Sequence, residues 1–406
     1  MKRIYYRIVY TLDSPLSVGS GQDDNTDMDV MLNSIGEPYI PATSIAGVLR
    51  HGLNDTDKEN TLFGSLDSVA QSPVIVYDAE LDSEDTISVR DSVELDENKC
   101  GVDGAKFDFE IVETGAKFIG YIELTDKAVT SYNEIEHLLA RVNSGELRFG
   151  RKTTRGCGKV MLSVKKIVFD DIEKWLDFDM FAEHDWDNAD IIVFAESTSE
   201  MTHIKLSLKM IGGISIREYT TELPKNIGGD TAPDYKSLTL HGSGVPVIPG
   251  TSWAGAFRSR FTEFMGKEAT EYLFGYIIPK TQETQKSKIQ FSESIIEGAT
   301  PKLITRNSID RFSAGTNDGA LYTELTYFGG DTVLEITIPA DVEKSYKNAL
   351  AAVIADLHNG FLAVGGLTAI GRGLFQVTEF KINGSSRINE FKSFAEEGGV
   401  ADAIYQ

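Results

Sequence analysis

Residues 38–47 read PYIPATSIAG, and residues 246–255 read PVIPGTSWAG. The two stretches place proline, Ile-Pro, Thr-Ser and Ala-Gly in the same order, with an offset of 208 residues between them. A sustained internal period marks a repeated structural unit, and it outranks other patterns when a fold is assigned. The pair therefore predicts that one domain occurs twice in this chain.

Further matches follow in the same order along both halves. They are LFGS (62–65) with LFGY (273–276), VRDSV (89–93) with TRNSI (305–309), DGA (103–105) with DGA (318–320), and RGCGKV (155–160) with IGRGLF (370–375). Their offsets lie between 211 and 216, so the insertions between matched segments are small. Both halves are therefore predicted to share one fold.

Length and composition agree with two globular domains. The chain has 406 residues, of which 41% are hydrophobic and 25% charged, whereas single cores stop growing at about 250–300 residues. Its two cysteines, Cys100 and Cys157, lack CxxC spacing, which argues against a disulfide framework or a structural zinc site. No signal-peptide pattern and no long apolar run occurs, so we expect a cytoplasmic protein without membrane spans.

The formal net charge of -23 argues against attraction of nucleic acid by the overall field of the protein. RNA binding would then need a local basic surface. The run RFGRKTTRGCGK (148–159) has five basic residues and no acidic one. We interpret it as a binding loop, and the alternative is an ordinary solvated surface.

Alternating apolar residues predict strands, and capping residues predict helices. The predicted strands are 3–12, 72–81, 117–124 and 159–169 in the first half, and 191–198, 203–211, 333–340 and 374–382 in the second. Helices are predicted after each proline turn, capped by Thr43 or Ser44 and by Thr251 or Ser252, and at 131–143 and 345–360. This order predicts an α+β fold with a β-α-β-β-α-β core in each half.

We therefore predict a first domain at 1–169 and a second at 191–406. The stretch between them, 170–190, is acidic and aromatic and has no counterpart in the other copy. It is predicted to be a linker.

The repeated motifs, with VGSGQ (18–22) and TTRGCGKV (153–160), resemble the RAMP superfamily of CRISPR-associated proteins, in particular backbone subunits of type III effector complexes. The resemblance implies two tandem RRM-like (ferredoxin-like) domains with thumb hairpins, placed within 82–108 and 292–322. It also implies a fused double backbone subunit that binds CRISPR RNA and assembles with other effector subunits. Such a subunit would cleave complementary target RNA at regular intervals.

The resemblance implies RNA contacts at the capped helices, the thumbs and the glycine-rich loops. A helix N-terminus attracts phosphate, and glycine allows close approach of the backbone to RNA. The RNA-binding residues predicted on this basis are Gly19, Ser44, Arg50, Arg90, Arg148, Lys152, Arg155, Gly156, Gly158, Ser252, Arg258, Arg306, Arg311, Gly371, Arg372 and Gly373.

Catalysis is placed by the same resemblance. DMDVMLN (27–33) matches a family pattern that begins with the cleaving aspartate, which assigns Asp27, and Asp234 has similar spacing to the second proline turn. An aspartate with a pKa of about 3.9 is a weak base at neutral pH. Its expected role is to orient the ribose 2′-OH or to hold Mg²⁺ or Mn²⁺, and the alternative is a solvated acid in an acidic loop.

Two other functions remain open at this stage. One is a structural RNA-binding subunit without nuclease activity. The other is a guide-processing endoribonuclease, a class that usually relies on histidine. The repeated motifs contain no histidine, which argues against the second alternative.

Overall fold

The computed structural model describes residues 2–21, 25–65, 70–84, 87–95, 101–194, 201–218, 233–240, 243–278, 283–397 and 401–405. The chain forms two compact units. The first comprises Met1–Thr153 and Cys157–Ser199, and the second comprises Glu200–Gln406 together with the tripeptide Thr154–Gly156. By its contacts, this tripeptide of the basic loop therefore belongs to the second unit.

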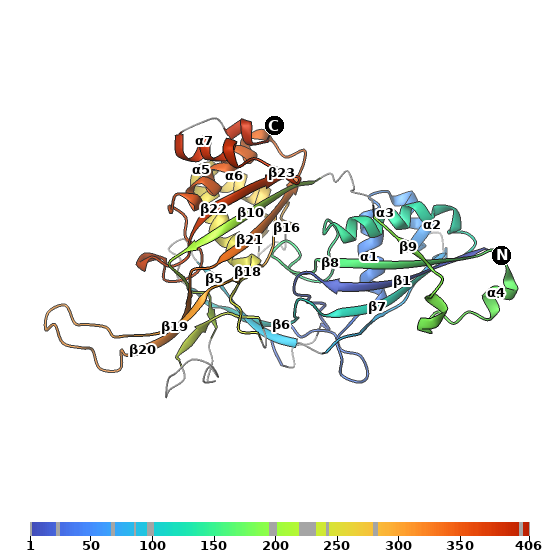
Figure 1. Cartoon of the computed structure of the whole chain (residues 1–406), viewed down its shortest axis with the longest axis horizontal. Helices are drawn as coiled ribbons and strands as arrows, with labels where there is room; N and C mark the ends of the chain where they lie inside the picture. Colours follow the sequence, from blue (N-terminus) through green and yellow to red (C-terminus); the bar gives the residue numbers. More distant parts are fainter. Residues whose placement is uncertain are drawn as a thin grey trace. The chain divides into compact units, whose positions relative to one another are not determined.

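The sheet of the first unit is centred on β1 (Arg3–Leu12), which pairs antiparallel with β7 (Lys117–Leu124) and β8 (Val160–Phe169). The outer strands are β2 (Tyr39–Ile40), β3 (Val74–Val76), β4 (Ala79–Leu81) and β9 (Asp190–Ile192). Alternate side chains of β1, such as Tyr6 and Ile8, are fully buried. They form one core with apolar residues of α1 (Ala42–Gly52), α2 (Thr56–Phe63) and α3 (Tyr132–Asn143) (Figure 1).

The second unit repeats this arrangement. Its central strand β10 (Met201–Ile211) lies between β21 (Asp331–Pro339) and β22 (Leu374–Ile382). The outer strands are β14 (Val247–Ile248), β17 (Gln290–Phe291), β18 (Ser294–Glu297) and β23 (Ser385–Ser386), and the helices are α5 (Gly250–Phe274), α6 (Lys344–His358) and α7 (Ile388–Glu397). The α+β prediction of two ferredoxin-like copies is confirmed.

Each unit carries a hairpin beside the main sheet. In the first unit it is β5 (Ile87–Leu95) with β6 (Gly101–Val112), and in the second β19 (Thr300–Arg306) with β20 (Tyr322–Phe328). Short strands β11 (Gly213–Ile214), β12 (Arg217–Glu218) and β13 (Tyr235–Ser237) extend the second hairpin into a sheet. The segment between β19 and β20 projects far from the rest of its unit (Figure 1). Both hairpins begin within the predicted thumb ranges, 82–108 and 292–322, but extend beyond them to Val112 and Phe328.

The stretch 170–190, the predicted linker, belongs to the first unit by its contacts. It contains α4 (Ile172–Leu176) and a short 3-10 helix (Glu183–Trp186). Trp186 is fully buried and donates its indole N–H to Met180 O at 2.9 Å. Of the predicted strand 191–198, only residues 191–192 belong to β9, and 195–198 lie outside the described residues.

The predicted helix caps are wrong. α1 and α5 begin directly after Pro41 and Pro249, and neither start has a side-chain cap hydrogen bond. Proline fixes the backbone at a helix start, so Ser44 and Ser252 lie inside the first turn, where their N–H groups donate to Pro41 O and Pro249 O at 2.9 Å each.

Candidate functional site

Asp27 is exposed and bonded to the hairpin of its own unit. Its N–H donates to Asp108 Oδ1 at 3.0 Å, and its Oδ2 accepts from the N–H of Asp108 on β6 at 3.0 Å. The loop is also held next to β6 by Glu110, whose N–H donates to Met28 O and whose carboxylate accepts from the N–H of Val30. Asp27 is therefore fixed against the hairpin while its side chain stays exposed to solvent.

Its neighbour Asp29 has a different role. Asp29 is 7% exposed. Its carboxylate accepts from the N–H of Asn25 at 3.0 Å and from the N–H and hydroxyl of Thr26 at 2.8 Å each. A buried carboxylate with these donors holds the turn together. Burial and hydrogen bonding thus distinguish Asp29 from the exposed Asp27.

Asp234 has the same arrangement in the second unit. It is exposed and directly precedes β13. Its N–H donates to Thr323 O at 2.9 Å, and its Oδ2 accepts from the N–H of Thr323 on β20 at 2.6 Å. Asp108 and Thr323 are 215 residues apart, which is the repeat offset of this region. The two predicted aspartates therefore occupy equivalent positions, each bonded to its own hairpin.

Gly158 and Gly373 are required by local packing. Both are buried and have φ values of 82° and 75°. A Cβ at Gly158 would overlap the carbonyl oxygen of Phe149, and one at Gly373 would overlap that of Val364. Only glycine fits such a conformation at such a close approach, and the RNA contacts of these two glycines stay predictions.

Gly156 is buried as well, while Gly371 is exposed. A Cβ at Gly156 would lie 2.9 Å from Glu293 N and 3.1 Å from Gly250 Cα, within the second unit. A Cβ at Gly371 would have nothing within 4 Å. Of the four predicted loop glycines, Gly371 is thus the one with space for a ligand.

Three predicted arginines are held in ion pairs. Arg90 is 6% exposed and pairs with Glu113 at 3.2 Å. Arg372 is 5% exposed and pairs with Glu324 at 3.1 Å, and half-buried Arg306 pairs with the same carboxylate at 2.9 Å. Buried charges need such partners. The guanidiniums of Arg90 and Arg372 thus neutralise internal glutamates, and their RNA contacts stay predictions.

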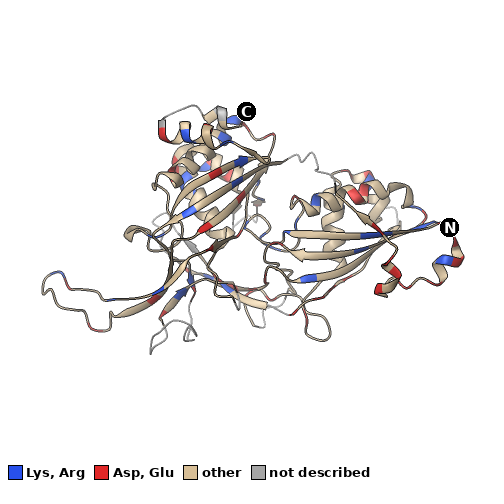
Figure 2. Ribbon diagram, viewed as in Figure 1, with Lys and Arg blue, Asp and Glu red and all other residues tan. Residues whose placement is uncertain are grey.

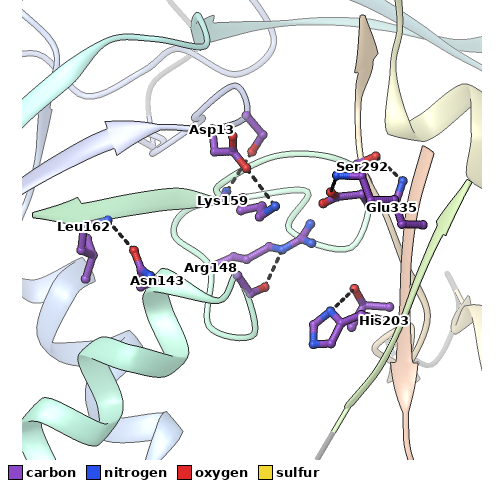
Figure 3. A network of polar contacts seen from close by, with 12 residues as sticks. Asp13, Asn143, Arg148, Lys159, Leu162, His203, Ser292 and Glu335 are labelled. Atoms are coloured by element: carbon purple, nitrogen blue, oxygen red, sulfur yellow. Dashed lines mark hydrogen bonds and ion pairs between the residues drawn. The ribbon is translucent and has the colours of Figure 1, made fainter. Parts of the chain in front are cut away.

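Several other basic side chains also have internal partners. In the first unit, Arg148 donates to Gly145 O at 2.9 Å (Figure 3). Lys152 has a left-handed backbone, with φ of 55°, and its ammonium lies 3.7 Å from the ring centroid of Phe109 on β6. Arg50 donates to Asn60 Oδ1 at 3.2 Å. These side chains are tied to the surface and partly exposed.

Arg155 and Arg258 line the same pocket of the second unit. The pocket has a volume of 160 Å³ and lies beside the first turns of α5. Arg155 is exposed, and Arg258 is half-buried and donates to Gly275 O at 3.1 Å. The backbone at Arg155 lies against Gly250, where a Cβ would be 2.5 Å from the carbonyl carbon of Arg155. The start of α5, with Ser252 in its first turn, is therefore partly covered by residues of the basic loop.

Two arginines outside the predicted set occupy matching places. Arg151 N–H donates to Ser17 O at 2.8 Å, and Gly366 N–H donates to Ser215 O at 2.7 Å, so Arg151 and Gly366 are equivalent positions. Two residues after these serines stand Gly19 and Arg217. The exposed guanidinium of Arg151 lies against Gly19, and that of Arg217 lies near Gly366. Each copy thus supplies one arginine to the same place from the opposite loop.

The sequence shows this swap of arginine and glycine only when both segments are compared together. In each segment alone, the arginine of one copy aligns with a glycine of the other: Arg151 with Gly366, and Arg217 with Gly19. Arg217 also stacks on Tyr235, with 4.5 Å between its Cζ and the ring centroid. Tyr235 is adjacent to Asp234, so this arginine is part of the second aspartate's surroundings. The exposed Arg311 lies apart from it, in the segment between β19 and β20.

Comparisons with known proteins address the family of the chain. No curated protein matches it. Among solved structures, a chain from the type III-B Cmr-beta complex bound to cognate target RNA shares 15% identity with a TM-score of 0.33. That match covers 45% of this chain and 60% of the other chain. A likeness at this TM-score establishes no shared function.

The family match is broader. A model described as the RAMP superfamily matches residues 9–161 and again residues 218–376. The two matches fall in the two halves of the sequence repeat, and each covers the hairpin and the glycine-rich loop of its copy. The chain belongs to the RAMP superfamily, and it contains two copies of that family's domain.

Proposed function

We propose that this chain is a fused double backbone subunit of a type III CRISPR effector complex, acting in the cytoplasm. It binds CRISPR RNA and, through Asp27 and Asp234, cleaves complementary target RNA at two sites. One observation carries this proposal: each exposed aspartate accepts, through its Oδ2, the backbone N–H of an equivalent hairpin residue, Asp108 or Thr323, and donates its own N–H back to that residue. Two equivalent sites in one chain support two cuts in one target.

The chemistry proposed for each aspartate is orientation of the ribose 2′-OH. The 2′-oxygen forms a bond to the adjacent phosphorus, the bond from phosphorus to the 5′-oxygen breaks, and the leaving oxygen takes up a proton. The hydroxyl proton passes to the carboxylate or to water. The N–H bond from the hairpin fixes the position of the carboxylate. Less conformational entropy is therefore lost when the carboxylate and the 2′-OH reach the reactive geometry. Products with a 2′,3′-cyclic phosphate follow, and DNA is not cut, because it lacks the hydroxyl.

We propose a metal ion only as one that an aspartate and the bound RNA hold together. Among the described residues, no three His, Cys, Asp or Glu side chains gather to hold a metal ion. Mg²⁺ commonly binds one or two carboxylates together with substrate phosphates, so Asp27 or Asp234 would hold Mg²⁺ or Mn²⁺ jointly with RNA. Such an ion would stabilise negative charge on the phosphate.

RNA binding is proposed for the exposed basic groups. These are Arg151 and Arg217, the pair Arg155 and Arg258, and Arg311 on the second hairpin. Lys and Arg contacts to phosphate make binding salt-dependent without specifying sequence. In a chain with a net charge of -23, loss of any of these groups is expected to weaken RNA binding measurably.

A second function is favoured by a specific observation. Each carboxylate already accepts a backbone N–H of its hairpin, and an aspartate in this position stabilises the hairpin without any chemistry. A structural RNA-binding subunit therefore remains the competing proposal. Among the described residues, no helix is long and apolar enough to cross a membrane, and neither function requires one.

The test uses the assembled complex with guide RNA and an end-labelled complementary target. The proposal predicts two cuts with cyclic-phosphate ends and an intact DNA target of the same sequence. The double variant Asp27→Asn, Asp234→Asn keeps a side-chain acceptor for the hairpin and should assemble normally but leave the target uncut. Unchanged cutting by this variant would favour the structural alternative.

A further inference from the structure

The face of the first unit's sheet opposite α1, α2 and α3 carries an aromatic pocket. Tyr5 of β1 and Glu123 of β7 are paired residues on this face, opposite the buried core. The segment after α4 covers them, and Trp175 donates its indole N–H to Tyr5 OH at 2.8 Å. The pocket has a volume of 320 Å³ and is lined by Tyr5, Tyr77, Glu123, Trp175 and Phe178, with Leu176 at its edge.

Two residues that line the pocket, Glu123 and Trp175, already contact a guanidinium. Arg3 forms an ion pair with the buried carboxylate of Glu123 and lies 5.0 Å from the Trp175 ring centroid. Cations are attracted to the faces of aromatic rings, most strongly to tryptophan. Its chemistry therefore suits arginine or lysine side chains rather than anions.

Exposed apolar side chains surround the pocket. Leu176 is 68% exposed, and Ile172, one helical turn earlier on α4, is 53% exposed. Phe181 is 65% exposed, although its ring contacts Tyr121 and Tyr77, with centroids 5.3 and 6.2 Å apart. Contiguous exposed apolar residues with a polar rim mark interaction surfaces. We call Ile172, Leu176, Phe181 and the adjoining pocket the outer-face surface.

The rim of the outer-face surface is acidic. Figure 2 shows acidic residues along the segment that carries α4, near the N-terminus. The exposed acids of this segment are Asp170, Asp171, Glu173, Asp177, Asp179, Glu183, Asp187 and Asp190. Phosphates would be repelled here, since nucleic acid binding depends on neutralising them with cations. The charge thus selects a positively charged occupant.

Among the described residues of the second unit, the equivalent central strand has a polar outer face. The corresponding face of β10 presents Lys205, which pairs with Glu335 at 3.2 Å, and Ser207, which donates to Glu379. These strands fold with a polar outer face, so the fold itself does not require aromatic residues there. The outer-face surface is an addition specific to the first unit.

We propose that the outer-face surface binds a basic segment of another protein. Apolar side chains of that segment cover Leu176 and Phe181, and its Lys or Arg side chains face the acidic rim and the aromatic pocket. This inference does not rest on RNA cleavage, because no residue of the surface contacts Asp27 or Asp234. Failure of either proposal leaves the other intact.

The test measures binding of the full-length protein to a short synthetic peptide that alternates arginine and leucine. Labelled peptide is followed by anisotropy, and Trp175 fluorescence provides a second signal from within the pocket. Comparison ligands are a peptide with glutamate in place of arginine and a single-stranded RNA of similar length. We expect the basic peptide alone to bind at this surface.

Matched variants locate the binding. Leu176→Ser with Phe181→Ser removes the apolar contacts, and Glu173→Gln with Asp177→Asn lowers the charge at exposed positions. Each double variant should weaken peptide binding by about tenfold, whereas Phe361→Ser, at a 72% exposed position of the second unit, should not. Equal binding by all variants, or RNA competition for the site, would overturn the inference.

Discussion

Asp27 and Asp234 each accept a backbone N–H of their hairpin through Oδ2, but the N–H of Asp27 donates to the side chain of Asp108 and that of Asp234 to the backbone oxygen of Thr323. The exchanged arginines also come from different segments, Arg151 from the glycine-rich loop and Arg217 from β12. The comparison teaches that the backbone of the repeated fold fixes the position of a charged group. The side chain that supplies it can come from either of two adjoining segments.

The two copies differ more strongly in how they compensate buried charge. In the first unit, Glu113 pairs with Arg90 and accepts from Ser88 Oγ at 2.6 Å. In the second unit, Glu324 pairs with both Arg306 and Arg372. The buried glutamate of the first unit therefore pairs with one guanidinium, whereas that of the second unit pairs with two.

The largest expected effect separates these two arrangements. Arg90→Ala leaves a buried glutamate without its cation and should lower the free energy of unfolding of the first unit by about 3–5 kcal/mol. Arg372→Ala leaves Glu324 with Arg306 and should cost the second unit about 2 kcal/mol. Urea unfolding of the full-length variants measures both. Equal losses would show that the second arginine adds nothing to charge compensation.

The glycine-rich loop of the second copy gives the next effect. Gly373→Ala would force a Cβ onto the carbonyl oxygen of Val364 at a positive φ, whereas Gly371→Ala meets open space at a similar φ. We expect a loss of about 3 kcal/mol or more for Gly373→Ala and about 1 kcal/mol for Gly371→Ala. Thermal unfolding followed by circular dichroism distinguishes them. Similar losses for both would argue against the packing role of Gly373.

The smallest effect concerns the exchanged arginines. Arg151→Gln and Arg217→Gln should each weaken RNA binding by about tenfold or less and should each reduce the salt dependence by about one phosphate contact. Filter binding of guide RNA over a series of salt concentrations measures this. Lys267→Gln, at an exposed position of α5 with a long 3.8 Å ion pair, is the matched control. A change for only one of the two arginines would show that their places are not equivalent.

The sequence predicted strands better than contacts. The predicted strands at 3–12, 117–124 and 374–382 coincide with β1, β7 and β22, because alternation of apolar residues reports directly on one buried face. Asp27 is assigned from the family pattern and Asp234 from its spacing to the second proline turn. In the structure both are bonded to equivalent positions of the two hairpins. Local sequence patterns were thus sufficient to predict the strands, because each strand's buried face is set by its own residues.

Contacts between distant segments could not be predicted from the sequence. The ion pairs of Arg90 and Arg372 join residues that are 23 and 48 positions apart. The space beside Gly158 is filled by the carbonyl oxygen of Phe149, which lies in another segment. The aromatic residues of 170–190 likewise find their partners on the folded sheet, which a local pattern does not show.

The central claim is that each copy holds one independent cleavage site. Its most direct test maps the cuts in one end-labelled target made by complexes that contain Asp27→Asn alone or Asp234→Asn alone. We predict that each variant loses one cut, a different one in each case, and retains the other at its normal position and rate. Loss of both cuts in either single variant, or of neither in both, would contradict the claim.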